Sequence, residues 1–220
     1  MSRYKRIIRD DAYYHIVNRG VEKRAVYLNS RDYRKFMKLL ELGCEKYAVE
    51  IVAFCLMPNH YHALIKSNKG EDVSPWAKWV QGVYAMWFNK QYERVGPLWQ
   101  NRFYAKEVGG GEHLAKTWMY VDQNPVKAKI ATSPGRWPWS SAWLRKSNFR
   151  PHYLVEPDWW FTPLKPKWLT QEMLDNETLS KVRISLKRSI VEEYSNNWEM
   201  PDGVPGTPVP GTPVPGTPVP

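Results

Sequence analysis

The sequence predicts an α+β fold in which helices cover an antiparallel sheet. Segments with the hydrophobic periods of strands and helices follow each other in the order β-α-β-β-α-β up to residue 108. That order is typical of the ferredoxin-like arrangement, also called the split β-α-β arrangement. A further helix is expected to follow the last strand.

The first half of this pattern is a strand, a helix and a pair of strands. Residues 12–18 (AYYHIVN) are β-prone and are followed by Arg-Gly. A serine N-cap and apolar side chains spaced i, i+3, i+4 and i+7 predict a helix over 30–47. Residues 50–56 and 60–66 read as strands, and Pro58-Asn59 marks the turn between them.

The second half contains a helix, a strand and the additional helix. Ser74-Pro75 is expected to open a helix that ends near Tyr92, because serine caps well and proline fits the first helical position. Residues 98–108 are the fourth predicted strand. Three glycines then break the chain, and a helix is expected over 112–123. Pro125 is expected to mark its end, because a residue before proline disfavours the helical conformation.

The chain divides into three parts by composition. Residues 1–146 are expected to form the catalytic or binding domain, and residues 147–200 form a C-terminal extension of uncertain role. Residues 201–220 form a tail that repeats Pro-Gly-Thr-Pro-Val. The repeat has neither charge nor aromatic side chains, so this tail is expected to be disordered.

The charge balance favours a polyanionic partner. The 220 residues include 32 Lys and Arg against 22 Asp and Glu, which gives a net charge of +10. Twelve Trp and thirteen Tyr accompany these cations. Aromatic rings among cations suit single-stranded nucleic acid, whose bases stack on them. The alternatives are that the aromatics form the core and that the protein is simply basic.

Cysteine usage and hydropathy exclude several protein classes. Cys44 and Cys55 do not form a CxxC pair, which excludes a zinc ribbon and makes a disulfide scaffold unexpected. No apolar run follows the N-terminal residues, and no stretch approaches the roughly 20 apolar residues of a membrane span. We therefore expect a cytoplasmic protein without a membrane partner. If the polyanionic partner that the charge favours is DNA, the protein would be associated with the nucleoid through it.

Two histidines in a predicted strand are the first candidate site. His60 and His62 are two residues apart, so their side chains point to the same face of a strand. Two imidazoles on one face can share a divalent metal ion. The alternative is that both rings are hydrogen-bonded or solvated.

A tyrosine and an asparagine on the last predicted helix are the second candidate site. Tyr120 and Asn124 are four residues apart and lie one helical turn apart on one face. A tyrosine can act as a nucleophile, although a free phenol with a pKa of about 10 is weak at neutral pH. The amide oxygen of Asn124 could serve as a third metal ligand. Spacing does not distinguish Tyr120 from an ordinary half-buried helix tyrosine.

Five sequence blocks, in this order and spacing, resemble the single-tyrosine HUH transposases, specifically the REP-associated tyrosine transposase branch. The blocks are residues 14–20 (YHIVNRG), 56–62 (LMPNHYH), 96–103 (GPLWQNRF), 120–128 (YVDQNPVKA) and 137–141 (WPWSS).

This resemblance implies a ferredoxin-like domain that cleaves and rejoins single-stranded DNA at hairpin repeats during transposition. His60 and His62 match the motif that holds a divalent metal ion, Mg²⁺ or Mn²⁺. Tyr120, on the extra C-terminal helix, matches the nucleophile that forms a 5′-phosphotyrosine, and Asn124 matches the polar residue that completes the metal site.

The chain departs from the family pattern at two positions. Tyr61 stands where an aliphatic residue is usual and should face the core, and Lys129 stands where the family often has glycine. The second departure puts the local turn in doubt. Arg19, Arg102 and Lys127 are candidates for phosphate contacts, although each could equally be a solvated surface charge.

Two other functions are weighed against this one. A domesticated transposase could bind a DNA or RNA hairpin without cutting it. A zinc-dependent hydrolase would need a third histidine or carboxylate at a matching spacing, and none is found. The sequence is compatible with a monomer and with a homodimer.

Overall fold

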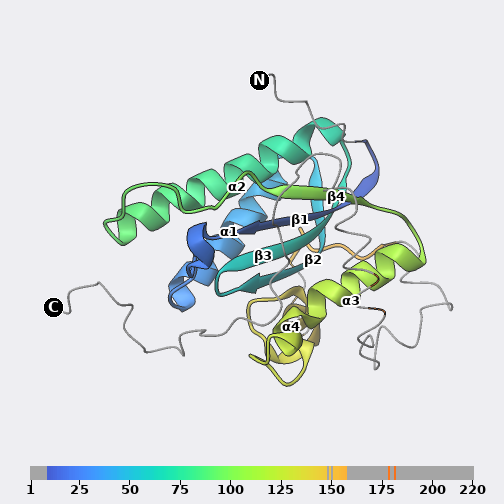
Figure 1. The fold of residues 1–220 in the computed structure, drawn as a ribbon. Helices are drawn as coiled ribbons and strands as arrows, with labels where there is room; N and C mark the ends of the chain where they lie inside the picture. The colour runs from blue at the N-terminus through green and yellow to red at the C-terminus, as the bar shows by residue number, and fades with distance from the viewer. Residues whose placement is uncertain (1–8, 148, 150, 158–177, 179–180, 182–220) are drawn as a thin grey trace.

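A computed structural model describes residues 9–147, 149, 151–157, 178 and 181 and contains a four-stranded antiparallel sheet (Figure 1). The strands have the spatial order β2-β3-β1-β4, which is the order of the split β-α-β arrangement and confirms the predicted fold class. The strands are β1 (Ala12–Arg19), β2 (Val49–Met57), β3 (His60–Ser67) and β4 (Tyr104–Val108).

Helices α1 (Ser30–Lys46) and α2 (Gly70–Gln91) cover one face of the sheet (Figure 1). Alternate side chains of each strand enter this larger core. Tyr61 is one of them, as predicted: its ring lies 5.0 Å from that of Phe36, and its hydroxyl accepts a 2.6 Å hydrogen bond from Gln81 Nε2. The other alternate residues of β3, which include both candidate histidines, therefore face the opposite side.

Helix α3 (Glu112–Lys127) packs on that opposite face, mainly over β2 (Figure 1). It forms a second apolar cluster with the sheet through Leu114, Trp118 and Val121. Within residues 9–147, the remaining helical segments are two short 3₁₀ turns, Val21–Lys23 and Pro134–Arg136, and α4 (Ser141–Lys146), none of which we predicted from the sequence.

The chain returns from α3 to cover the outer edge of β2. Leu56 N–H donates to Trp139 O at 2.9 Å, within the 137–141 block. Further along β2, Ile51 N–H donates to Tyr153 O at 3.0 Å and Ile51 O accepts from Val155 N–H at 2.8 Å. The expected boundary after residue 146 thus falls between two segments that both pair with β2.

Helix α2 begins at Gly70 instead of at the predicted Ser-Pro pair. Gly70 N–H donates to Asp10 Oδ1 at 2.7 Å, and Asp72 Oδ2 accepts from Ala48 N–H at 3.0 Å. These contacts with distant residues hold an earlier first turn, and Pro75 lies inside the helix.

The fourth strand is shorter than the predicted 98–108 and contains only Tyr104–Val108. Trp99 instead forms an isolated bridge with Gly20 and donates from Nε1 to Gln81 O at 3.0 Å. The aromatic side chain thus anchors this segment to α2, where sequence alternation had suggested continuous pairing.

Helix α3 continues past Pro125, where we expected it to end, to Lys127. Asn124 Nδ2 donates to Tyr120 O at 2.8 Å and to Val121 O at 3.3 Å. Val121 O is the acceptor that an ordinary residue 125 would bond through its backbone N–H. The Asn124 amide therefore supplies the donor that proline lacks.

The turn after α3 forms although it lacks the family's glycine. Lys129 takes a φ of 58°, which is the left-handed conformation that favours glycine. Its N–H donates to Val126 O at 2.9 Å, and Ile130 N–H donates to Pro125 O at 3.0 Å. These bonds close the helix end as in a glycine C-cap.

The tail of residues 201–220 and, apart from 178 and 181, residues 158–200 lie outside the described residues. Within the part that is described, no helix combines the length and apolar character needed to cross a bilayer.

Candidate active site

The predicted histidine pair lies on the α3 face of the sheet. His60 and His62 are 4% and 2% exposed, and their ring centroids lie 5.0 Å apart with the planes nearly perpendicular. Strand register places Arg19 of β1 opposite His60. The alternation inferred from the sequence thus places both imidazoles together.

A third histidine, His15 of β1, lies against this pair. Its Nε2 is 2.9 Å from His62 Nδ1, and the two rings are stacked with an interplanar angle of 7°. His15 belongs to the first of the five sequence blocks, but we predicted no role for it from the sequence. Alternation in β1 places it on this face, whereas the contact with His62 follows only from how β1 is aligned with β3.

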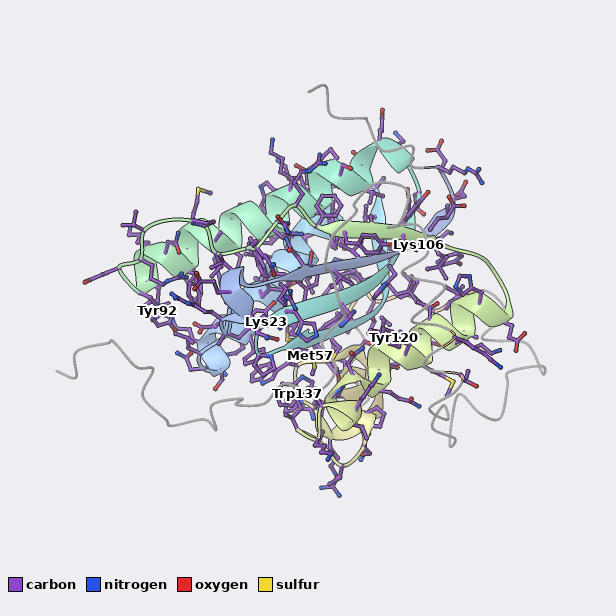
Figure 2. All side chains as sticks on the ribbon, viewed as in Figure 1. Lys23, Met57, Tyr92, Lys106, Tyr120 and Trp137 are labelled. Atoms are coloured by element: carbon purple, nitrogen blue, oxygen red, sulfur yellow. The ribbon has the colours of Figure 1, made fainter. Side chains whose placement is uncertain are left out.

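Tyr120 reaches the histidines from α3. Its ring makes an edge contact with His62 at 5.7 Å between centroids and another with His15 at 6.0 Å. Figure 2 shows Tyr120 on α3, between the helix and the sheet. The structure thus brings the predicted nucleophile to the predicted histidine pair.

Hydrogen bonds fix which nitrogen of His60 faces the site. His60 Nδ1 lies 2.7 Å from Asn59 Oδ1, while Asn59 Nδ2 donates to Lys23 O at 3.0 Å. Because an amide oxygen only accepts, His60 carries its proton on Nδ1 and keeps a lone pair on Nε2. Among the described residues, neither His60 Nε2 nor His62 Nε2 has a hydrogen-bond partner.

Burial keeps these rings neutral. It lowers the pKa of His15 to about 3, and burial together with the charge of Arg19 lowers the pKa of His60 to about 3. The pKa of His62 is lowered well below its ordinary value by burial and then by the two neighbouring histidines. Neutral imidazoles are the form that binds metal ions.

This donor set fits a divalent ion with few protein ligands. No group of three or more His, Cys, Asp or Glu suited to a metal occurs in the described part of the chain. An ion here would rest on the two imidazole Nε2 atoms and take its remaining ligands from amide, water or phosphate oxygens.

The other predicted site residues are placed differently. Asn124 uses its amide nitrogen within α3, and no described contact joins its side chain to the histidines. Arg19 is buried beside His60 and donates from Nε and Nη2 to Gln100 Oε1 at 3.0 and 2.8 Å. Arg102 and Lys127 are exposed.

A polar cluster fixes the helix that carries Tyr120. Asp122 accepts from Trp118 Nε1 at 2.8 Å, and its other oxygen lies 3.1 Å from Ser141 Oγ. The Arg145 guanidinium stacks over Trp118 at 4.3 Å and donates to Val52 O. Burial raises the pKa of Asp122 to about 6, which the Arg145 charge and these hydrogen bonds only partly offset. The cluster joins α3 to α4 and β2.

Comparisons with known proteins agree on one family. The model of the family described as "Transposase IS200 like" matches residues 9–124. A protein of Haemophilus influenzae that carries the name REP-associated tyrosine transposase is 26% identical over 152 residues, which are 64% of this chain and 85% of that protein.

A solved structure shares the fold. It is a REP-associated tyrosine transposase bound to a REP hairpin, with a TM-score of 0.55 and 19% identity, and the match covers 71% of this chain and 93% of that one. The family model covers just over half of the 220 residues and confirms the resemblance found in the sequence. The chain belongs to the IS200-like transposase family.

Proposed function

We propose that this protein is a metal-dependent single-stranded DNA endonuclease and strand transferase that acts on hairpin repeats of the REP type. The observation that carries the proposal is the meeting of Tyr120 with the histidine pair, with 5.7 Å between its ring and that of His62. Family membership supports the reaction class, and the hairpin bound by the solved relative supports the substrate.

In the proposed reaction the Tyr120 oxygen attacks the phosphorus of the scissile phosphodiester. A bond forms between Tyr120 Oη and phosphorus, and the bond from phosphorus to the 3′ oxygen breaks. The products are a 5′-phosphotyrosine and a free 3′-OH. Because the phosphodiester bond energy is retained, another 3′-OH can attack the phosphotyrosine and join strands without ATP.

The surrounding residues prepare this attack. Mg²⁺ or Mn²⁺ held by His60 Nε2, His62 Nε2 and the Asn124 amide oxygen would withdraw charge from the phosphate. Asn59 orients the first imidazole through its Nδ1. Arg19, buried beside His60, would contact a phosphate oxygen.

The burial of Tyr120 favours a flexible substrate. Tyr120 is 5% exposed at the junction of α3 and the sheet, so the scissile phosphate must approach closely to reach its hydroxyl. A single strand can bend its backbone into such a site more easily than a duplex, and exposed bases can stack on aromatic side chains.

The test is a covalent trapping assay. A labelled single-stranded oligonucleotide carrying the repeat hairpin found beside the gene is incubated with the protein and Mn²⁺ or Mg²⁺. We expect a protein–DNA band that survives denaturation, and peptide mapping should place the adduct on Tyr120.

Matched variants make the result specific. Tyr120→Phe and His62→Ala should lose the band, as should addition of EDTA, whereas Tyr47→Phe, at the end of α1, should keep it. Tight hairpin binding without a covalent band, across several flanking sequences, would instead identify a hairpin-binding protein that does not cut.

A further inference from the structure

The hydrogen bond between His15 and His62 differs in kind from the hydrogen bond between Asn59 and His60. His15 Nε2 and His62 Nδ1 face each other at 2.9 Å in the interior. Each of these nitrogens can either donate or accept, so one proton between them decides the state of both rings. His15 Nδ1, the remaining nitrogen, is buried and has no hydrogen-bond partner among the described residues.

Two arrangements of the neutral pair are possible. In the first, His15 Nε2–H donates to His62 Nδ1, so the His62 proton sits on Nε2 and that ring cannot bind a metal ion. In the second, His62 Nδ1–H donates to His15 Nε2, which leaves a lone pair on His62 Nε2. The first arrangement leaves an unpaired N–H on His62 Nε2 and the second leaves one on His15 Nδ1. Of these two nitrogens only His15 Nδ1 is fully enclosed, so the second arrangement carries the larger desolvation cost.

The two ligand histidines are therefore prepared differently. Asn59 Oδ1 only accepts, so His60 always presents its Nε2 lone pair. His62 presents a lone pair only when His15 accepts its proton. The unpaired Nδ1 of His15 favours the first arrangement when no metal is present.

We propose that His15 is a positioning residue of the metal site, which accepts the Nδ1–H of His62 when a metal ion binds and so orients that ring as a ligand. The proposal rests on the proposed function, because it assumes that His62 is a ligand. When a metal binds, the shared proton moves from His15 Nε2 to His62 Nδ1. His62 Nε2 releases its proton to water and His15 Nδ1 gains one from water, so the total number of protons is unchanged.

The first test measures metal affinity in the full chain. Free Mn²⁺ is followed by electron paramagnetic resonance during titration of wild type, His15→Phe and His15→Gln. Phenylalanine keeps a stacked ring without an acceptor, while the glutamine amide oxygen can reach about where Nε2 lies. Loss of a partner that orients a metal ligand typically weakens affinity by about 10- to 100-fold.

We expect that weakening in His15→Phe and a near-normal affinity in His15→Gln. His152→Gln is the matched control, because it removes a histidine that lies near Glu45, away from the site, and should leave affinity unchanged. Wild-type affinity in His15→Phe, or equal losses in the Phe and Gln variants, would overturn the proposal. The melting temperature of each metal-free variant reports on its folding.

The second test reads the tautomers directly and needs no variant at the site. Long-range ¹H–¹⁵N spectra of the histidine rings are recorded without metal and with Zn²⁺ as a diamagnetic probe. We expect His62 to carry its proton on Nε2 without metal and on Nδ1 with Zn²⁺, while His60 keeps Nδ1–H in both. A His62 ring with the same tautomer in both conditions would contradict the proposed shift.

The design separates the two proposals. One result is that wild type does not bind Mn²⁺, and another is that its Mn²⁺ binding persists in His60→Ala and His62→Ala. Either result would refute both the metal site and the role of His15. If wild type binds Mn²⁺ and the tautomer and the His15→Phe affinity do not change, only the role of His15 fails.

Discussion

Lys129 shows how one residue departs from a family pattern without loss of structure. Its φ of 58° costs a residue with a side chain about 1–2 kcal/mol compared with the right-handed region. The hydrogen bonds that close the end of α3 compensate for this strain, so the turn survives without glycine.

Lys129→Gly should therefore stabilise the protein. We expect the free energy of unfolding to rise by up to about 1 kcal/mol, because glycine adopts this conformation freely but loses more chain entropy on folding. Urea denaturation measures the change. Lys127→Gly, inside α3, is the control and should destabilise by up to about 1 kcal/mol; a loss of stability in Lys129→Gly would contradict the strain argument.

At the residue level, the sequence identified three residues of the candidate site and missed a fourth. His60 and His62 were chosen from their spacing and Tyr120 from the family resemblance, and the structure brings their side chains together. His15 was missed because its partner lies on another strand, and strand register is set by packing of the whole sheet. The trapping assay tests the chemical roles of these residues.

At the level of elements, the order along the chain was predictable and the ends were not. Helix α2 starts early because Asp10 binds its first N–H, and α3 continues because the Asn124 amide replaces the donor missing from Pro125. In the first case the deciding partner is distant in sequence. In the second it is a side chain whose rotamer no periodicity reveals.

The polar cluster that joins α3 to α4 should make stability depend on pH. Burial raises the pKa of Asp122 to about 6, so the folded state holds this proton more tightly than the unfolded chain does. The protonated Asp122 carboxyl group contributes fully to the stability of the folded state below the ordinary carboxyl pKa. This contribution is lost as pH rises through about 6, the pKa of Asp122 in the folded state. A shift of this size corresponds to on the order of 3 kcal/mol.

Asp122→Asn should remove this pH dependence. Between about pH 4 and 7.5, the stability difference between variant and wild type should shift in favour of the variant as pH rises, because only wild type must ionise a buried carboxyl group. Urea denaturation of both proteins at each pH measures this difference. The buried histidines are present in both proteins, so their contribution cancels. Glu112→Gln, on the exposed first turn of α3, is the control; a difference that does not vary with pH would refute the role of Asp122.

For the whole molecule, the excess of cations has a measurable consequence. With a net charge of +10, hairpin binding should release counterions and weaken with salt. For about four phosphate contacts, affinity should fall by roughly 100-fold between about 50 and 200 mM salt. Fluorescence anisotropy with a labelled hairpin measures this slope.

Variants on opposite faces of the sheet locate the charges responsible. Lys127→Gln, at the end of α3, should reduce the salt slope by about one contact, while Lys38→Gln, on α1 behind the sheet, should leave it unchanged. Equal effects of the two substitutions would mean that the net charge acts without a defined DNA path.

The segments that line β2 also bear on self-association. A sheet edge with unpaired backbone groups is a template for another chain, and β2 would be such an edge around Ile51 without the residues that follow α4. Tyr153 and Val155 instead occupy the hydrogen-bonding groups of Ile51. The stretch after α4 thus blocks intermolecular strand addition at this part of β2, which gives a structural role to residues that follow the last of the five sequence blocks.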